Sequence, residues 1–287
     1  MTSTHPTLPP YPLVDVLIIG AGPAGISCAA ALARFRHTAI VFSSNKFRNE
    51  DFYVDHRDPS ELRAASREGI LARYKTIYFE DVGIQTVEKI SKNGDGEGSS
   101  FFKAIDDIGK DWWGRKLVLA TGVGDILVDI EGYEECWAKS IFHCLYCHDY
   151  KSSPAQSAGV LAIGDCASPH IALHLARQAL RLSENVTTYT HGNNALTEEI
   201  ETAKVVSNPN VKSKCRITKQ TKDFAHQLDI ELTEQGDIKV TAPFNETSVR
   251  GSFETGDRAS MLKNVVGAMY SGTRAAAGVG SQIQGED

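Results

Sequence analysis

Short apolar runs alternate with longer mixed segments along this chain. Residues 14–19, Val-Asp-Val-Leu-Ile-Ile, are apolar enough to form a buried parallel strand. The Ala-rich segment after them predicts a helix from about Ala24 to Phe35, and residues 38–42 predict a second buried strand. A strand, a helix and a strand in this order are typical of an α/β protein with a parallel sheet.

The pattern continues with a capped helix and several short strands. Asp58-Pro59-Ser60-Glu61 predicts a helix start, with Asp58 as the N-cap and proline in the first helical position. The helix is expected to end near Tyr74. Its expected inward-facing residues are Leu62, Ala65, Ile70 and Tyr74. Strands are expected at residues 77–79, 82–90, 101–105 and 116–120.

A second α/β unit follows in the later half of the chain. Its expected elements are a strand at 158–164, a helix at about 170–182 and a strand at 186–189. The remaining expected elements are a helix at 198–203, strands at 230–232 and 238–240, and a helix of small residues at about 261–283.

Composition and charge narrow the class of protein. With 287 residues, 41% of them hydrophobic and 23% charged, the chain is long enough for two ordinary globular domains. The net charge of −6 and the lack of Lys/Arg runs argue against a nucleic-acid partner. The longest apolar runs fall far below the length of a membrane span. We therefore expect neither a nucleic-acid nor a membrane partner.

The six cysteines point to redox or metal chemistry. Residues 1–12 carry no export signal, so a reducing, cytoplasmic location is expected. In such a compartment a close cysteine pair is more often catalytic or metal-binding than structural. Cys144-x-x-Cys147 is such a pair, with His143 and His148 beside it. The other cysteines are expected to be packed or inert: Cys28, Cys136, Cys166 and Cys215.

The cysteine pair allows four interpretations. Two thiols at this spacing can exchange a disulfide for a dithiol. Cys-x-x-Cys-His is also the attachment signature of c-type haem, but that reaction requires export. Zinc would require a second ligand pair at tight spacing, and because none is visible no metal site is predicted. A structural pair without redox chemistry stays open.

The motif Gly20-x-Gly22-x-x-Gly25 stands between the first strand and the first helix. In this context it is a dinucleotide fingerprint, because glycines allow a pyrophosphate to approach the backbone at a helix N-terminus. Pro23 and Ala24 lie inside the same turn and belong to the predicted site. The second strand should end in an acid that binds the ribose, but here Ser43 follows it, and a hydroxyl binds a ribose more weakly than a carboxylate does.

Four motifs together resemble those of the thioredoxin-reductase-like flavoproteins. They are Gly20-x-Gly22-x-x-Gly25, Ala120-Thr121-Gly122, Cys144-x-x-Cys147 and Gly256-Asp257. The resemblance spans nearly the whole chain and implies FAD as the cofactor. It implies that the first motif binds the FAD pyrophosphate and that Thr121 and Gly122 lie against the same cofactor. It also implies that Gly256 and Asp257 reach the ribityl–pyrophosphate part.

Within that family the chain is more similar to the fungal dithiol oxidases of the gliotoxin-oxidase type. The shared features are Phe142-His143-Cys144-x-x-Cys147-His148, and residues 55–59, 186–192 and 243–248. The resemblance implies that a small-molecule dithiol of fungal secondary metabolism is oxidised to a disulfide, with O2 as acceptor. It implies that Cys147 is nearer the flavin, that Cys144 is the exposed partner, and that His148 is the base. A homodimer is the family's expectation.

The second strand–helix turn reads Gly164-Asp165-Cys166-Ala167-Ser168-Pro169. Only its first glycine fits a nucleotide fingerprint, and an Asp would repel a phosphate. No Arg pair follows Tyr189 to bind a 2′-phosphate, so we expect no NADPH site. Two alternatives stay open: an NADPH-dependent disulfide reductase, and a non-catalytic accessory protein descended from such an enzyme.

The expected fold class is therefore α/β, with two Rossmann-like, doubly wound, three-layer nucleotide-binding domains. The FAD-binding domain is discontinuous and comprises residues 12–124 and 241–287. A shortened middle domain, residues 125–240, carries the cysteine pair and a degenerate NAD(P)-type site. The chain looks short between Asn49 and Asp55 and between Cys215 and Gln227, where relatives carry longer segments.

Overall fold

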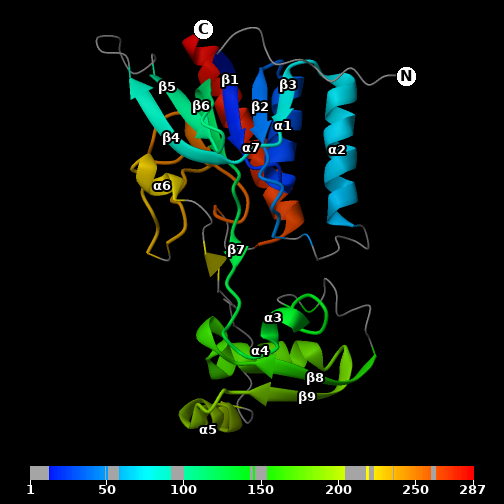
Figure 1. Cartoon of the computed structure of the whole chain (residues 1–287). Helices are drawn as coiled ribbons and strands as arrows, with labels where there is room; N and C mark the ends of the chain where they lie inside the picture. Colours follow the sequence, from blue (N-terminus) through cyan, green and yellow to red (C-terminus); the bar gives the residue numbers. More distant parts are fainter. Residues whose placement is uncertain are drawn as a thin grey trace. The chain divides into compact units, whose positions relative to one another are not determined.

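The computed structural model describes residues 13–48, 50, 58–91, 100–142, 145, 154–203, 218–219, 223–234, 236–259 and 263–287. The chain forms two compact units (Figure 1). Unit 1 contains the described residues of 1–50, 57–124 and 220–287, and unit 2 those of 125–219. Each unit is described by itself below.

A seven-stranded sheet forms the centre of unit 1, in the order β3-β2-β1-β6-β5-β4, with β11 also paired to β6. Its strands are β1 (Leu13–Ile19), β2 (Ala39–Phe42), β3 (Ile77–Glu80), β4 (Ile84–Ser91), β5 (Ser100–Asp106), β6 (Asp111–Leu119) and β11 (Ser252–Glu254). Five strands run parallel to one another: β3, β2, β1, β6 and β11. The pairings of β6 with β5 and of β5 with β4 are antiparallel. This arrangement confirms the parallel sheet expected from the apolar runs.

Strand β6 changes partners along its length. Its first part, up to Gly114, pairs with β5, and its last part, from Leu117, pairs with β11. A Cβ at Gly114 would lie 2.7 Å from the Leu17 Cγ, so the strand passes β1 closely at this point. Strand β6 begins earlier than expected and contains both Trp112 and Trp113.

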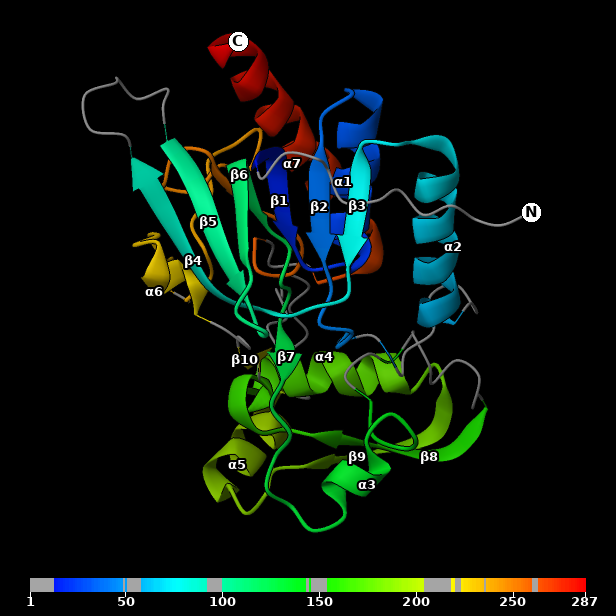
Figure 2. The ribbon, with the colours of Figure 1, turned by 45° about the horizontal axis from the view of Figure 1, so that its top comes forward.

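Helices α1 (Pro23–Arg34) and α7 (Val265–Glu286) lie side by side behind β1 and β2 (Figures 1 and 2). With α2 (Pro59–Arg73) they cover one face of the sheet. The contact between α1 and α7 is close because small residues meet there. A Cβ at Gly272 would lie only 2.1 Å from the Ala24 carbonyl oxygen. The small-residue helix predicted at the end of the chain thus packs backbone to backbone on the first helix.

On the second face of the sheet, α6 (Phe224–Gln227) packs against side chains of β1, β2, β4, β5 and β6 in one core cluster. Gln227 fixes α6 to β4, because its Oε1 accepts a hydrogen bond of 2.8 Å from the Val87 N–H. The expected domain boundary at residue 240 therefore needs correction. Ile230 and Ile238 pack into this cluster, so the described residues from 223 onward belong to unit 1.

Unit 2 is small. Its sheet has two parallel strands, β8 (Ala155–Leu161) and β9 (Ser183–Tyr189), joined by α4 (Pro169–Ala179), and α5 (Asn194–Ala203) packs on α4. The remaining elements are α3 (Tyr133–Cys136), the 3-10 turn η2 (Gly164–Cys166) and a two-stranded sheet of β7 (Gly124–Asp125) and β10 (Thr218–Lys219). The strand–helix–strand order agrees with the sequence, and within the described residues the β8–β9 sheet stops at two strands.

Some local expectations were wrong. The two strands expected at 230–232 and 238–240 reduce to one bridge between Leu232 and Ile238. On α2, Ala65 is exposed and Arg63 is buried, because the Arg63 guanidinium packs 3.7 Å over the Phe47 ring centroid. Among the described residues, no helix is both long and apolar enough to cross a membrane.

The close contact between α1 and α7 gives the first prediction. Gly272→Ala places a methyl group against the Ala24 carbonyl, so we expect the free energy of unfolding to fall by about 2 kcal/mol or more. Gly285→Ala, in the same helix, is the matched control, because no atom lies within 4 Å of its Cβ. That control should be neutral or stabilised by up to about 1 kcal/mol. Urea unfolding of both variants is the measurement, and equal stability would contradict the close packing.

Candidate functional site

The carboxyl ends of four parallel strands meet at one edge of the sheet in unit 1. β1 leads to Gly20, β2 leads to Ser43, β6 leads to Thr121, and β11 leads to Gly256 and Asp257. Ligands of open α/β sheets bind at this edge, where the connections leave in different directions. The structure thus brings together, in one unit, residues that are distant in the sequence.

The first glycine motif is required by steric contacts. Gly20 has φ +115°, and a Cβ there would lie 2.2 Å from the Ala120 carbonyl oxygen. A Cβ at Gly25 would lie 1.9 Å from the Gly20 carbonyl oxygen. By contrast, no atom lies within 4 Å of a Cβ placed on Gly22. Gly20 and Gly25 hold the turn tight, and Gly22 leaves open space at the start of α1.

That open space faces a helix terminus with no protein cap. Gly22 is the N-cap of α1 and Pro23 follows it, and no side chain in the described part of the chain accepts a hydrogen bond from the first turn. The first turn also contains no acidic residue. The N–H groups of such a terminus and its partial positive charge attract an anion. A pyrophosphate fits this environment, with Ala24 and Gly25 supplying backbone N–H groups.

Polar side chains lie at the two neighbouring strand ends. Ser43 is 3% exposed, and its hydroxyl donates to the Asn45 Oδ1 at 2.9 Å and accepts from the Asn45 N–H at 3.2 Å. Thr121 Oγ1 is buried and has no hydrogen-bond partner within the described part of the chain. Gly122 has φ +62° and open space at its Cβ position. An orphaned hydroxyl and an open glycine leave room for a bound group.

Gly256 and Asp257 adjoin the same helix start. Gly256 has φ +87°, and a Cβ there would lie 3.3 Å from the Ala24 Cβ. Its N–H donates a 2.8 Å hydrogen bond to the Ser271 Oγ on α7. Asp257 Oδ2 lies 3.2 Å from the Arg48 Nη1. The geometry therefore agrees with an FAD site, and an orphaned threonine, an uncapped helix and an open glycine all fit that cofactor.

A buried carboxyl group that the sequence patterns did not predict lies beside this edge. Glu254 on β11 is 0% exposed, and among the described residues neither carboxyl oxygen has a hydrogen-bond partner. Burial raises the pKa of Glu254 to about 8, and the nearby charge of Arg258 counteracts this only in part. The signal was present in the sequence, as an acid inside the short strand that precedes Gly256.

The second strand–helix turn, in unit 2, also begins with a positive-φ glycine, Gly164, and has proline at the helix start, but it differs from the first in its cap and its middle residues. Ser168 caps α4, because its Oγ accepts from the Ile171 N–H at 3.3 Å, and Pro169 follows it. Cys166 places a side chain in the turn, where it is 3% exposed and disulfide-bonded. The Ser168 side chain already accepts a hydrogen bond from a backbone N–H at the start of α4. A second dinucleotide would need such N–H groups for its phosphates.

Cys166 was expected to be packed or inert. It is packed, and it is also disulfide-bonded, with a partner that is not among the described residues. Cys28 is free and fully buried, and burial raises its pKa to about 12, so it is inert. Cys136 is free and half-buried.

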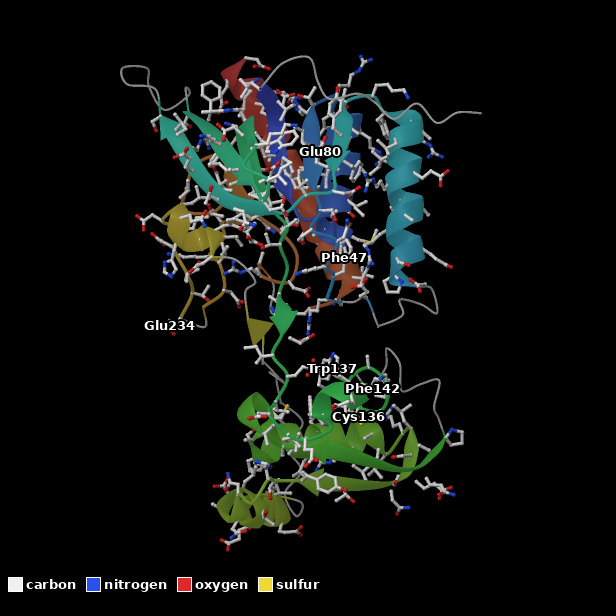
Figure 3. The ribbon with its side chains drawn as sticks, viewed as in Figure 1. Phe47, Glu80, Cys136, Trp137, Phe142 and Glu234 are labelled. Atoms are coloured by element: carbon white, nitrogen blue, oxygen red, sulfur yellow. The ribbon has the colours of Figure 1, made fainter. Side chains whose placement is uncertain are left out.

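The predicted catalytic residues Cys144, Cys147 and His148 lie outside the described residues. The chain leading to them is described up to Phe142. It contains α3 and a bridge between Trp137 and Ile141, with the Tyr133 and Trp137 rings stacked at 5.9 Å. Figure 3 shows Cys136, Trp137 and Phe142 around this turn in unit 2.

Comparison with known proteins places the chain in a family. A sequence model described as pyridine nucleotide-disulphide oxidoreductase matches residues 14–203. Thioredoxin reductase tcpT of Claviceps purpurea is 39% identical, covering 91% of this chain and 91% of its own length. Thioredoxin reductase aclD of Aspergillus oryzae is 38% identical, covering 95% of this chain and 97% of its own. The crystal structure of HlmI superposes with a TM-score of 0.79 at 25% identity, covering 96% of this chain and 93% of that chain.

The chain therefore belongs to the pyridine nucleotide-disulphide oxidoreductase family. Within it, the chain is a thioredoxin-reductase-like oxidoreductase with the Rossmann-like fold of those flavoproteins. Proteins of this kind bind FAD, which confirms FAD as the cofactor that the family resemblance implies.

The buried acid on β11 gives the second prediction. The pKa of Glu254 is raised from 4.5 to about 8, so the folded state retains a proton that the unfolded state has released between these values. Stability contributed by the neutral acid is complete below pH 4.5 and is lost as the pH rises to about 8. Between pH 4.5 and about 8, the free energy of unfolding of the wild type should fall by on the order of a few kcal/mol relative to that of Glu254→Gln.

Denaturant unfolding at pH 5 and pH 8 measures this difference. Glu68→Gln, at an exposed position of α2, is the control and should change stability equally at both pH values. A stability difference between wild type and Glu254→Gln that does not depend on pH would contradict a neutral Glu254.

Proposed function

We propose that this protein is an FAD-dependent dithiol oxidase that converts a small-molecule dithiol of fungal secondary metabolism into a disulfide, with O2 as acceptor. The observation that carries this proposal is the contrast between the two strand–helix turns. The first has an uncapped helix terminus and an open glycine at Gly22, whereas the second is capped by Ser168 and carries the disulfide-bonded Cys166. This contrast supports a single dinucleotide site, in unit 1. Without a second site for a nicotinamide, the thiols of the substrate are the source of the electrons.

The reaction begins with thiol exchange at Cys144 and Cys147. A thiolate of the substrate attacks one sulfur of their disulfide, the S–S bond breaks, and the other cysteine leaves as a thiolate. The second thiol of the substrate attacks the mixed disulfide, so the substrate leaves as a disulfide and both cysteines are reduced. The resemblance assigns the exposed position to Cys144.

His148 holds and moves the protons in this scheme. An imidazole has an unperturbed pKa near 6.5 and can accept the proton of an attacking thiol at neutral pH. FAD, when bound, would supply the redox chemistry that takes two electrons from the reduced pair and reduces O2 to hydrogen peroxide. The overall balance is one dithiol and one O2 converted into one disulfide and one hydrogen peroxide.

Unit 1 binds and orients the cofactor in this proposal. Gly22, Ala24 and Gly25 would hold the pyrophosphate at the start of α1, and Ser43 would bind the adenosine ribose. Thr121 and Gly122 would lie against the cofactor, and Gly256 and Asp257 would reach its ribityl part. The family expectation of a homodimer and a cytoplasmic location complete the proposal.

An NADPH-dependent disulfide reductase is the second candidate. The names of the fungal relatives favour it, because tcpT and aclD are both called thioredoxin reductases. The capped turn at Ser168 and the sequence Thr190-His191-Gly192 after β9 argue against a site for the NADPH phosphates. A non-catalytic accessory protein is the alternative outside enzymes.

Oxygen consumption separates these candidates and is the third prediction. With a small dithiol such as dithiothreitol, the FAD-loaded protein should consume O2 and release hydrogen peroxide in equal amounts. NADPH in place of the dithiol should give no consumption above background, because unit 2 lacks a second fingerprint. Consumption driven by NADPH would support the reductase, and none with either reagent would support the accessory protein.

Cysteine variants give the fourth prediction. Cys144→Ser and Cys147→Ser should each lower the rate of dithiol oxidation to background, because either change removes one sulfur of the exchanging pair. Cys136→Ser is the matched control, since Cys136 is a free, half-buried cysteine of the same unit, and it should retain the wild-type rate. Retained oxidation in either pair variant would remove the pair from the mechanism.

A further inference from the structure

An ion pair links two strand ends of unit 1. The Nη1 of Arg48 lies 3.2 Å from the Oδ2 of Asp257, and the side chains are only 19% and 21% exposed. The two residues are 209 positions apart in the sequence. Arg48 follows β2 and Asp257 follows β11, so the pair connects strands that lie on opposite sides of β1 and β6.

Asp257 carries its negative charge close to the helix terminus that receives the pyrophosphate. Gly256, its neighbour, approaches Ala24 in the first turn of α1 so closely that a Cβ would come within 3.3 Å. A pyrophosphate diester bears two negative charges. An uncompensated carboxylate at this place would repel it, and in a partly buried site that repulsion is weakly screened. The site therefore needs a cation beside Asp257, and Arg48 supplies one.

The segment that carries Arg48 is held in place by packing. Phe47 lies under the guanidinium of Arg63, with 3.7 Å between that group and the ring centroid, and Arg63 is only 9% exposed. Figure 3 labels Phe47 beside the lower part of α2. On the other side, the Lys263 Nζ donates a hydrogen bond to the backbone oxygen of Asp257. Both partners of the ion pair are thus fixed by their own neighbours.

We propose that Arg48 is a positioning residue for FAD, which neutralises and holds Asp257 beside the start of α1 so that the pyrophosphate can bind there. The cofactor is the one established for the family, so the proposal does not depend on the dithiol reaction. It assigns a cofactor role to the loop after β2, where Ser43 replaces the expected acid.

The fifth prediction concerns FAD affinity, which is measured by titrating FAD into the full-length protein after its flavin has been removed. Arg48→Gln should weaken FAD binding about tenfold or more, because the partly buried Asp257 carboxylate loses its ion pair with Arg48. Arg48→Lys keeps the charge and should recover most of the affinity. Arg67→Gln is the matched control, because Arg67 pairs with Asp81 on the exposed surface of the same unit, and it should bind FAD like the wild type.

Two further arms test how Arg48 acts. ADP carries the pyrophosphate and should show the same loss in Arg48→Gln, whereas riboflavin lacks it and should show none. In the Asp257→Asn background, Arg48→Gln should cost less than about twofold, because the repelling charge is gone. Thermal unfolding of the flavin-free variants checks that each is folded.

Wild-type affinity in a folded Arg48→Gln variant would overturn the proposal. An equal loss with and without the Asp257 carboxylate would also overturn it, since Arg48 would then contact the phosphate directly instead of neutralising Asp257. Failure of the wild type to bind FAD would contradict the family's cofactor and is visible in the first titration, separately from any effect of Arg48.

Discussion

The close approach of three backbone segments around the first strand–helix turn governs the structure of unit 1. Gly20 meets the end of β6, Gly25 meets Gly20, and Gly272 on α7 meets α1, each without room for a side chain. These contacts bring the last helix and the last strand of the chain to the start of the first helix. The same contacts leave the α1 terminus uncapped at Gly22, which is why an anion fits there.

The acidic side chains near the α1 terminus are arranged so that neither carries an unbalanced charge there. Asp257 and Glu254 are both acids close to the proposed pyrophosphate site, and their charges are neutralised in different ways. Asp257 is paired with Arg48, whereas Glu254 is fully buried and its raised pKa keeps it neutral at moderate pH. Neither acid then opposes the binding of a pyrophosphate. In unit 2 the corresponding turn is closed by the Ser168 cap and by the disulfide-bonded Cys166.

Much of the fold followed from local patterns in the sequence. The apolar run at 14–19, the glycine motif and the Asp58 cap predicted β1, α1 and α2, because burial, steric contact and capping act over short distances. Long-range packing was harder to predict. Residues 223–240 were assigned to the middle domain, but their apolar side chains are buried against β4. Three features depend on partners that no local sequence pattern identifies. They are the packing of Arg63 on Phe47, the Arg48–Asp257 ion pair and the Cys166 disulfide. The roles of Cys144, Cys147 and His148 stay predictions.

The central claim is that thiols, and not a nicotinamide, deliver electrons to an FAD held by unit 1. The absorption spectrum of the purified, FAD-loaded protein under anaerobic conditions tests it most directly. We predict that a stoichiometric dithiol bleaches the visible absorption band of the oxidised flavin, and that admitted air restores it. Bleaching by NADPH, or an unchanged band after the dithiol, would contradict the claim.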